Sequence, residues 1–302
     1  MLAPVAVFAY KRMDKLEKCL ESLDKCYLSE NSDLYIFSDG YKGTDDKILV
    51  EETRDFIRYY SKNSRFNSVN LSFSDHNKGL AGSIISGVST VIKKFGRIIV
   101  VEDDLVVSED FLIYLNGALD YYNDDKRYGS ISAYSYPLKS LKNYDMDVYA
   151  MRKGECWGWG TWSDRWQDVD WQVSDFDKYF NSLKMRHDFD SLEIGLDSML
   201  CNQVAGRIDS WAVRWLYHLY KHNYFTVYPR FSKTSNNGFD NSGIHCDSTD
   251  KYQISLINEK TEFEFNKVIP VRRIEAECRY YPAGLLERIK YILWYYNKSL
   301  LH

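Results

Sequence analysis

The chain carries a run of four β-branched residues, Ile98-Ile99-Val100-Val101, followed directly by Glu102-Asp103-Asp104-Leu105. A strand of this composition is typical of a parallel sheet, in which helices cover both faces. In such sheets ligands gather at the carboxyl ends of the strands. Three adjacent carboxylates repel one another unless a cation or hydrogen-bond donors compensate. The run therefore predicts a buried strand that ends in a cation-binding or ligand-binding loop, and a solvated acidic loop is the alternative.

The residues before this run alternate between strand and helix patterns. Strands are expected at 4–9, 34–37, 69–73 and 98–101, and helices near 14–23, 51–60 and 81–94. This order predicts an α/β fold with a doubly wound, mostly parallel sheet and helices on both faces. Further along, helices are expected at 108–122, 175–183 and 210–221, with strands and turns over 129–151. No repeat or low-complexity linker divides the chain, which favours one domain over 1–270 and a helical extension over 271–302.

Composition excludes several classes of protein. The net charge of −4 argues against a duplex nucleic-acid binder, which needs a basic face. Six cysteines form no CxxC pair and no zinc-type spacing, so reduced thiols in a cytoplasmic protein are expected. No stretch of about 20 apolar residues is present, as a membrane-spanning helix would require. The 25 Tyr, 15 Phe and 8 Trp residues supply core, or platforms that stack on sugars and bases.

The acidic run resembles the DxD-type motif of nucleotide-sugar glycosyltransferases with the GT-A fold. Glu-Asp-Asp-Leu after a β-branched strand is similar to the motif of the N-acetylglucosaminyltransferase I family, and the chain also resembles bacterial polysaccharide glycosyltransferases. The likeness covers residues 3–245 and is strongest around 102–105. It implies a GT-A (Rossmann-like) domain with a nucleotide-binding half over 1–105 and an acceptor half over 106–270. It also implies Mn²⁺ or Mg²⁺ held by carboxylates against the diphosphate of the donor.

The resemblance assigns roles to residues at three strand ends. Asp104 is the expected metal ligand, and Glu102 and Asp103 are expected to face the ribose and sugar. Arg12 follows the first strand and corresponds to a basic residue that approaches the nucleotide. Asp39 follows the second strand and corresponds to an acidic group that accepts from an NH of uracil or guanine. A partner to a nearby Lys or Arg is the alternative for Glu102, and ordinary turn positions are the alternative for Arg12 and Asp39.

Two glycine-containing segments complete the expected donor site. Gly79 and Gly82 permit close backbone approach at the start of a helix, where free NH groups favour phosphate, and Lys78 adds a positive charge. The segment 155–162 places glycines between tryptophans, which suits a platform for the donor sugar at Trp159. A plain turn is the alternative for the first segment, and a buried aromatic cluster is the alternative for the second.

Candidates for catalysis and for anion binding lie in the later part of the chain. Transfer with inversion needs a base for the acceptor hydroxyl. Asp209, in Asp209-Ser210-Trp211, resembles the Asp-x-Trp that carries this base; Asp197 is the second candidate, and a helix N-cap is the alternative role for Asp209. In the polar loop that follows, Arg230 and Lys233 suit a diphosphate. By resemblance His245 reaches the metal, and a structural role is its alternative.

These observations predict a metal-dependent, inverting hexosyl- or N-acetylhexosaminyltransferase. It would move a sugar from a nucleotide diphosphate donor, a UDP-sugar, to a hydroxyl of a glycan acceptor in bacterial surface polysaccharide synthesis. A sugar-phosphate nucleotidyltransferase and a non-enzymatic carbohydrate-binding protein are the alternatives. The stretch 283–296 predicts an amphipathic helix, which either lies on the inner face of the membrane near a lipid-linked acceptor or packs on the domain or on a second subunit.

Overall fold

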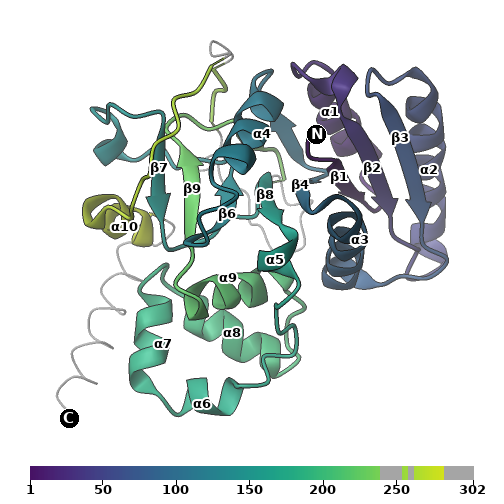
Figure 1. The fold of residues 1–302 in the computed structure, drawn as a ribbon. Helices are drawn as coiled ribbons and strands as arrows, with labels where there is room; N and C mark the ends of the chain where they lie inside the picture. Colours follow the sequence, from purple (N-terminus) through teal and green to yellow (C-terminus); the bar gives the residue numbers. More distant parts are fainter. Residues whose placement is uncertain (239–253, 258–261, 282–302) are drawn as a thin grey trace.

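The computed structural model describes residues 1–238, 254–257 and 262–281 (Figure 1). Its centre is an eight-stranded sheet with the order β3-β2-β1-β4-β8-β6-β9-β7. The first four strands are β3 (Ser68–Phe73), β2 (Asp33–Ser38), β1 (Val5–Ala9) and β4 (Arg97–Glu102). All neighbours among these four strands are parallel. The parallel half expected from the sequence is therefore confirmed, and the carboxyl ends of its strands share one edge.

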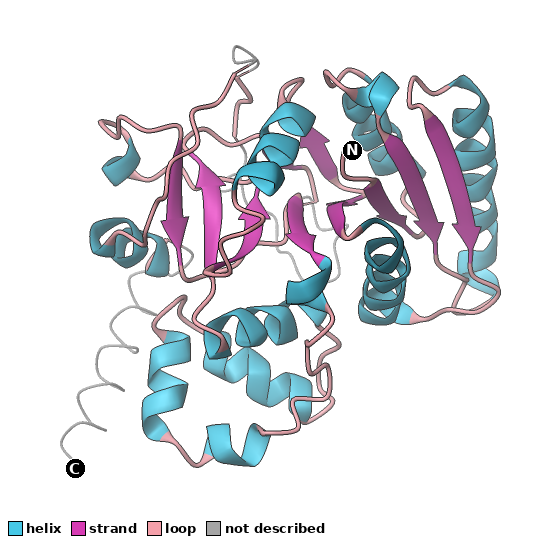
Figure 2. Ribbon diagram, viewed as in Figure 1, coloured by secondary structure: helices cyan, strands magenta, loops and turns pink. Residues whose placement is uncertain are grey.

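Helices cover both faces of this parallel half, as Figure 2 shows. The helices between its strands are α1 (Met13–Asp24), α2 (Thr44–Asn63) and α3 (Gly79–Phe95). Successive side chains of a strand point to opposite faces. Accordingly, Val5 and Val7 of β1 join the core cluster of α1 and α2, whereas Ala6 and Phe8 join the cluster of α3. The α/β class and the helices on both faces are thus confirmed.

The second half of the sheet is mixed. It consists of β8 (Trp159–Trp162), β6 (Tyr128–Ser132), β9 (Phe225–Pro229) and β7 (Val148–Met151). Strand β8 runs antiparallel to both β4 and β6, β9 runs parallel to β6, and β7 runs antiparallel to β9. Directly after the acidic run, β5 (Leu105–Val107) pairs with β10 (Thr234–Asn236) in a separate antiparallel ribbon. The ribbon joins two segments far apart in the sequence beside the end of β4.

The remaining helices follow β4 in the sequence. They are α4 (Phe111–Tyr121), α5 (Ser163–Trp166), α6 (Phe176–Phe180), α7 (Leu183–Asp190), α8 (Leu196–Val204), α9 (Trp211–Lys221) and α10 (Arg272–Arg279), with 3₁₀ turns at Ser29–Asn31 and Lys139–Leu141. Helices α6 to α9 form one group in Figure 1, with their own core around Tyr179, Phe189 and Val213. Helices α7 and α8 were not predicted from the sequence.

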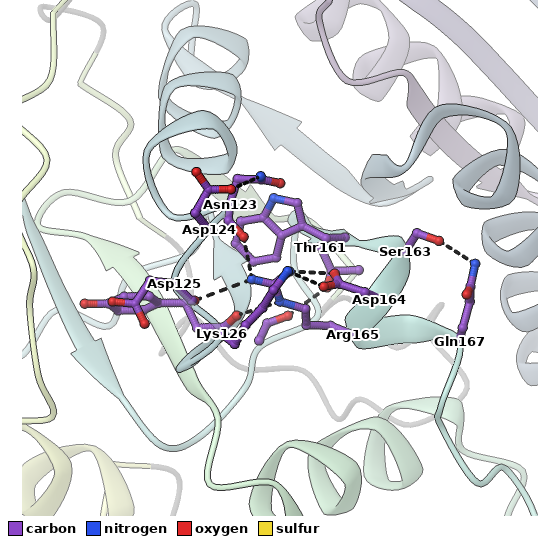
Figure 3. A network of polar contacts seen from close by, with 12 residues as sticks. Asn123, Asp124, Asp125, Lys126, Thr161, Ser163, Asp164, Arg165 and Gln167 are labelled. Carbon is purple, nitrogen blue, oxygen red and sulfur yellow. Dashed lines mark hydrogen bonds and ion pairs between the residues drawn. The ribbon is translucent and has the colours of Figure 1, made fainter.

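A buried arginine joins α5 to the start of β6. The guanidinium of Arg165 donates to the carbonyl oxygens of Asn123 and Tyr128 at 2.8 and 3.2 Å and pairs with Asp164 at 2.5 Å (Figure 3). Its side chain is 1% exposed. Arg165 therefore donates hydrogen bonds to carbonyl groups of this turn and fixes its conformation.

The C-terminal extension begins with a helix that packs on the domain. Ile274 and Cys278 of α10 lie in one core cluster with Tyr149 and Tyr228 of the sheet. The amphipathic helix predicted at 283–296 lies outside the described residues. Within the described ranges, no helix is long and apolar enough to cross a membrane.

Candidate functional site

The ends of β1 and β4 bring a guanidinium against two carboxylates. These strands are neighbours in the sheet, so Arg12, just after β1, reaches the acidic run after β4. Arg12 Nη2 donates to Asp104 Oδ2 at 3.0 Å and forms a shorter ion pair with Asp103 Oδ1. Arg12 Nε also donates to Asp103 Oδ2 at 3.5 Å. The convergence of these strand ends follows from the parallel topology expected from the sequence.

Burial dominates the electrostatics of the acidic run. Asp103 is 4% exposed, and burial raises its pKa to about 6 although the adjacent Arg12 guanidinium lowers it. Burial likewise raises the pKa of Glu102 to about 8, and the charges of Asp104 and Asp103 add to the shift. Asp104 retains 16% exposure of its side chain. Asp104 is therefore more accessible to a ligand than the buried Asp103.

Carboxylate oxygens are the donors that Mg²⁺ and Mn²⁺ prefer, so the side chains of Asp103 and Asp104 fit a divalent cation in chemistry. In their present geometry these oxygens face the Arg12 guanidinium. Within the described part of the chain, no group of three or more His, Cys, Asp or Glu side chains is arranged to hold a metal ion. The other expected ligand, His245, lies outside the described residues. A bound cation would thus share the carboxylates with Arg12 or displace it.

Asp39 holds the start of α3 in place. Its carboxylate is 5% exposed and accepts from the backbone NH of Lys78 at 2.9 and 3.1 Å and from that of Gly40 at 2.9 Å. The two loops also touch directly, because a Cβ at Gly40 would lie 2.4 Å from the carbonyl carbon of His76. Asp39 therefore brings Lys78, which immediately precedes α3, to the same edge of the sheet as Arg12.

Arg54, which the sequence patterns did not single out, fixes the loops that follow β2 and β3. Arg54 of α2 is 9% exposed and donates to the carbonyl oxygens of Asp39 at 3.2 Å and Ser74 at 2.7 Å. It therefore clamps the ends of β2 and β3 together. Its position in a polar helix resembled that of any solvated arginine, so no sequence signal distinguished it.

Asp209, in the turn before α9, lies close to the start of α3. A Cβ built on Gly79, which has a φ of +72°, would lie 3.2 Å from Asp209 Oδ2. The Asp209 side chain is 61% exposed, and its Oδ1 lies 3.3 Å from Arg214 Nη2. The structure thus brings Asp209 close to Gly79, the residue that follows Lys78. The N-cap position of α9 belongs to Ser210, whose hydroxyl accepts from the NH of Val213, so Asp209 does not fill the alternative role as a cap.

Asp197, the second candidate base, lies elsewhere. It is 8% exposed within the group of helices α6 to α9, and its Oδ1 accepts from the hydroxyl of Tyr179 at 2.8 Å. Arg186 binds both of its oxygens, at 2.9 and 2.8 Å. Such a bidentate pair inside a helical core fixes the packing of α7 on α8. The interpretation of Asp197 as a base is therefore corrected.

Trp159 is a core residue, and its expected role as a sugar platform is wrong. It is 0% exposed, and its ring stacks on Trp211 at 5.3 Å with an interplanar angle of 23°. Trp166 and Trp215 lie 5.6 and 5.8 Å away. The burial follows from β8, which lies between β4 and β6 in the sheet. The alternative interpretation, a buried aromatic cluster, is the correct one.

The two basic residues expected to bind diphosphate have other partners. Lys233 is 4% exposed, and its Nζ pairs with Asp110 Oδ2 at 2.6 Å. Arg230 Nη2 donates to the carbonyl of Lys142 at 3.1 Å, and its backbone NH donates to that of Asp147 at 2.7 Å. Neither side chain is directed to the acidic run in this geometry. A role of either residue at a diphosphate therefore stays a prediction, because it would require the side chain to leave these partners.

The segment after β10 packs on Asp104, a contact that the sequence patterns did not predict. The backbone NH of Asn237 donates to the carbonyl of Asp104 at 2.9 Å, and a Cβ on Gly238 would lie 2.4 Å from Asp104 Oδ2. Lys15 Nζ holds the carbonyl of Asn237 at 3.0 Å. The Asn-Asn-Gly turn signal was visible, but its pairing with the acidic run depends on the β5–β10 ribbon. A side chain at position 238 would therefore require the Asp104 carboxylate to move.

No protein-family model and no curated protein matches this chain. Among solved structures, it is similar to S. aureus TarS 1–349, with 16% identity and a TM-score of 0.36 over 49% of this chain and 42% of that one. It is also similar to the mannosyltransferase PcManGT from Pyrobaculum calidifontis in complex with GDP-Man and Mn²⁺, with 13% identity and a TM-score of 0.38 over 54% of this chain and 44% of that one. TarS 1–349 in complex with UDP-GlcNAc gives 15% identity and a TM-score of 0.35 over 47% and 39%. The chain spans less than half the length of each of these structures.

Proposed function

We propose that the chain is a metal-dependent, inverting glycosyltransferase that transfers a sugar from a nucleotide diphosphate donor, a UDP-sugar, to a hydroxyl group of a glycan. The observation that carries this proposal is the meeting of Arg12, Asp39, Lys78, Asp104 and Asp209 at one edge of the parallel sheet. Ligands of open α/β sheets bind at this edge. The set combines the charges that a diphosphate needs with a separate carboxylate that is exposed to an acceptor.

Each residue has a role that its surroundings support. Asp39 and the backbone it holds would orient the base of the nucleotide, and Lys78 would place a positive charge beside the phosphates. Asp104, with Asp103, would hold Mn²⁺ or Mg²⁺, which supplies charge neutralisation for the departing diphosphate. Arg12, now on these carboxylates, would then turn its guanidinium to a phosphate oxygen.

Asp209 would act as the general base. A carboxylate that is mostly exposed can take the proton of an acceptor hydroxyl as the oxygen attacks the anomeric carbon. Attack on the face opposite the leaving diphosphate inverts the configuration, so a UDP-α-sugar gives a β-linked product. The proposal includes an acceptor in bacterial surface polysaccharide synthesis, carried on a lipid, and a cytoplasmic site of action at the inner face of the membrane.

The alternatives lack a supporting observation. A nucleotidyltransferase usually has a glycine-rich basic loop after the first strand, and Phe8-Ala9-Tyr10-Lys11-Arg12 is not one. A carbohydrate-binding protein without catalysis would use exposed tryptophans, whereas Trp159 lies in the core.

The test is incubation with a panel of UDP-, GDP-, CDP- and dTDP-sugars, with and without Mn²⁺. We expect transfer or slow hydrolysis of a UDP-sugar that requires the metal, and NMR of the product gives its anomeric configuration. Asp209→Asn should bind UDP as the wild type does and lose about 10²-fold or more in transfer. The exposed Asp168→Asn is the matched control and should keep full activity. Release of pyrophosphate, or an α-linked product from a UDP-α-sugar, would contradict the proposal.

A further inference from the structure

Arg214, in the first turn of α9, uses three separate NH groups for three different partners. Its Nε donates to the carbonyl of Ser210 at 3.0 Å, and its Nη1 donates to the carbonyl of Trp171 at 3.1 Å. Its Nη2 donates to Asp209 Oδ1 at 3.3 Å. Because the guanidinium is planar and rigid, two backbone contacts determine where the third NH points.

Arg214 is buried and Asp209 is exposed, which indicates that the arginine fixes the position of the aspartate. The Arg214 side chain is 11% exposed, whereas that of Asp209 is 61% exposed. Burial lowers the pKa of Arg214, and the charge of Asp209 opposes this. An exposed aspartate usually samples several rotamers, and an exposed ion pair contributes little to stability. Here the arginine is held by the backbone of two segments, and it offers the aspartate one defined position.

The other carboxylate oxygen faces a different element. Oδ2 lies 3.2 Å from the place where a Cβ would stand on Gly79, the first residue of α3. The turn that carries Asp209 is fixed as well, because the NH of Ser210 donates to Gln203 Oε1 at 2.6 Å. The carboxylate therefore lies between α9 and α3, with Oδ1 on the arginine and Oδ2 toward the end of the helix beside Lys78.

We propose that Arg214 is a positioning residue for transfer, which directs Asp209 so that Oδ2 accepts the proton of the acceptor hydroxyl. This inference rests on the proposed function, in which Asp209 is the base. The O–H bond of the acceptor breaks as its oxygen forms the bond to the anomeric carbon, the proton goes to Oδ2, and the electron pair of the broken glycosyl–phosphate bond leaves with the diphosphate. Arg214 itself does not exchange a proton in this step, since a guanidinium stays charged.

Three variants separate positioning from charge and from folding. Arg214→Lys keeps the charge but cannot contact Ser210, Trp171 and Asp209 together. Arg214→Met removes both the charge and the planar set of NH donors. Arg207→Met is the matched control, since Arg207 is an exposed arginine two residues from Asp209 that donates to Asn202. We expect kcat to fall about 10-fold in Arg214→Lys and about 100-fold in Arg214→Met, the scale for a misplaced catalytic group, with the Kd of UDP unchanged. Arg207→Met should match the wild type.

A double variant tests whether Arg214 acts through Asp209. If it does, adding Arg214→Met to Asp209→Asn lowers kcat no further, because the group that it positions has already lost its basicity. The proposal would be overturned if the loss of kcat in the double variant equalled the product of the losses in the two single variants. It would also be overturned if the Arg214 variants bound UDP more weakly with kcat unchanged. An Arg214→Met enzyme as active as Arg207→Met would overturn it as well. If Arg214→Met fails to fold, the kcat of Arg214→Lys and its Kd for UDP test the proposal instead. Lack of transfer by the wild type on every donor rejects the proposed function and this inference together, whereas an active wild type with unaffected Arg214 variants rejects only the inference.

Discussion

Replacement of Lys233 by methionine tests whether the ion pair at the β5–β10 ribbon is structural. Lys233 Nζ lies 2.6 Å from Asp110 Oδ2, and the two residues are 4% and 0% exposed. Methionine keeps an unbranched apolar stem and removes the charge. Asp110 would then remain buried at the start of α4 with the hydroxyl of Ser108 on its other oxygen, at 2.5 Å.

The size of the effect follows from these contacts. Removal of one partner of a buried ion pair typically costs about 3–5 kcal/mol, because the other charge is left uncompensated. Asp110 keeps the Ser108 hydroxyl and lies at a helix N-terminus, which favours an anion. We therefore expect Lys233→Met to lower the free energy of unfolding by about 3 kcal/mol, at the low end of this range. This loss corresponds to a decrease of roughly a hundredfold in the ratio of folded to unfolded protein.

Urea unfolding followed by tryptophan fluorescence measures this loss. Asp110→Asn in the Lys233→Met background should restore part of the stability, since no buried charge is left without a partner. Lys184→Met is the control, because Lys184 forms an exposed pair with Asp188 and its loss should be small. The reasoning is refuted if Lys233→Met is as stable as Lys184→Met and instead loses affinity for UDP. In that case Lys233 binds the diphosphate.

Three further changes have defined outcomes. Asp104→Ala should abolish metal-dependent binding of UDP in calorimetry, because the cation and the diphosphate lose their shared carboxylate. Burial lowers the pKa of His218 from 6.5 to about 4, with a contribution from His222, so the unfolded chain binds a proton that the folded chain excludes. Stability from this group is complete above pH 6.5 and is lost as the pH falls to 4, and His218→Phe should flatten that slope in urea titrations. Deletion of residues 283–302 should abolish co-sedimentation with anionic liposomes at low salt.

Each of these outcomes has a counterpart that would contradict it. Undiminished metal-dependent binding by Asp104→Ala would show that the cation has other ligands. The same loss of stability at low pH in His218→Phe would assign the slope to other groups. Full-length protein that fails to bind anionic liposomes would place the C-terminal segment on the domain or on a second subunit.

Those parts of the fold that depend on local pattern were predictable. The β-branched run at 98–101 strongly favours a buried strand, and the earlier apolar segments at 4–9 and 34–37 are also expected as strands, with helical patterns between them. Once the sheet is parallel, the residues after these strands must meet at one edge. The contact of Arg12 with Asp103 and Asp104 therefore followed from topology, although its geometry did not.

Other roles depended on partners that no local pattern shows. Lys233 looked like an anion-binding residue in a polar loop, but its partner Asp110 is 123 positions away. Trp159 looked like a surface platform because glycines flank it. However, the glycine at 160 lets β8 lie close against β4, where a Cβ would be 3.2 Å from the carbonyl oxygen of Ile98. That insertion into the sheet, which buries Trp159, arises from pairing of distant segments.

The clustered indoles of Trp159, Trp166, Trp211 and Trp215, on α3's side of the sheet, have an optical consequence. Trp211 follows Asp209 by two residues, and its ring lies 5.3 Å from that of Trp159. Trp159 belongs to β8, whereas Trp211 and Trp215 belong to α9. Aromatic rings at this separation interact directly, so their near-ultraviolet circular dichroism depends on how α9 lies against the sheet. The protein thus contains an intrinsic probe at the base of the Asp209 turn, and a change in this signal on addition of UDP or an acceptor would report movement of that turn without any attached label.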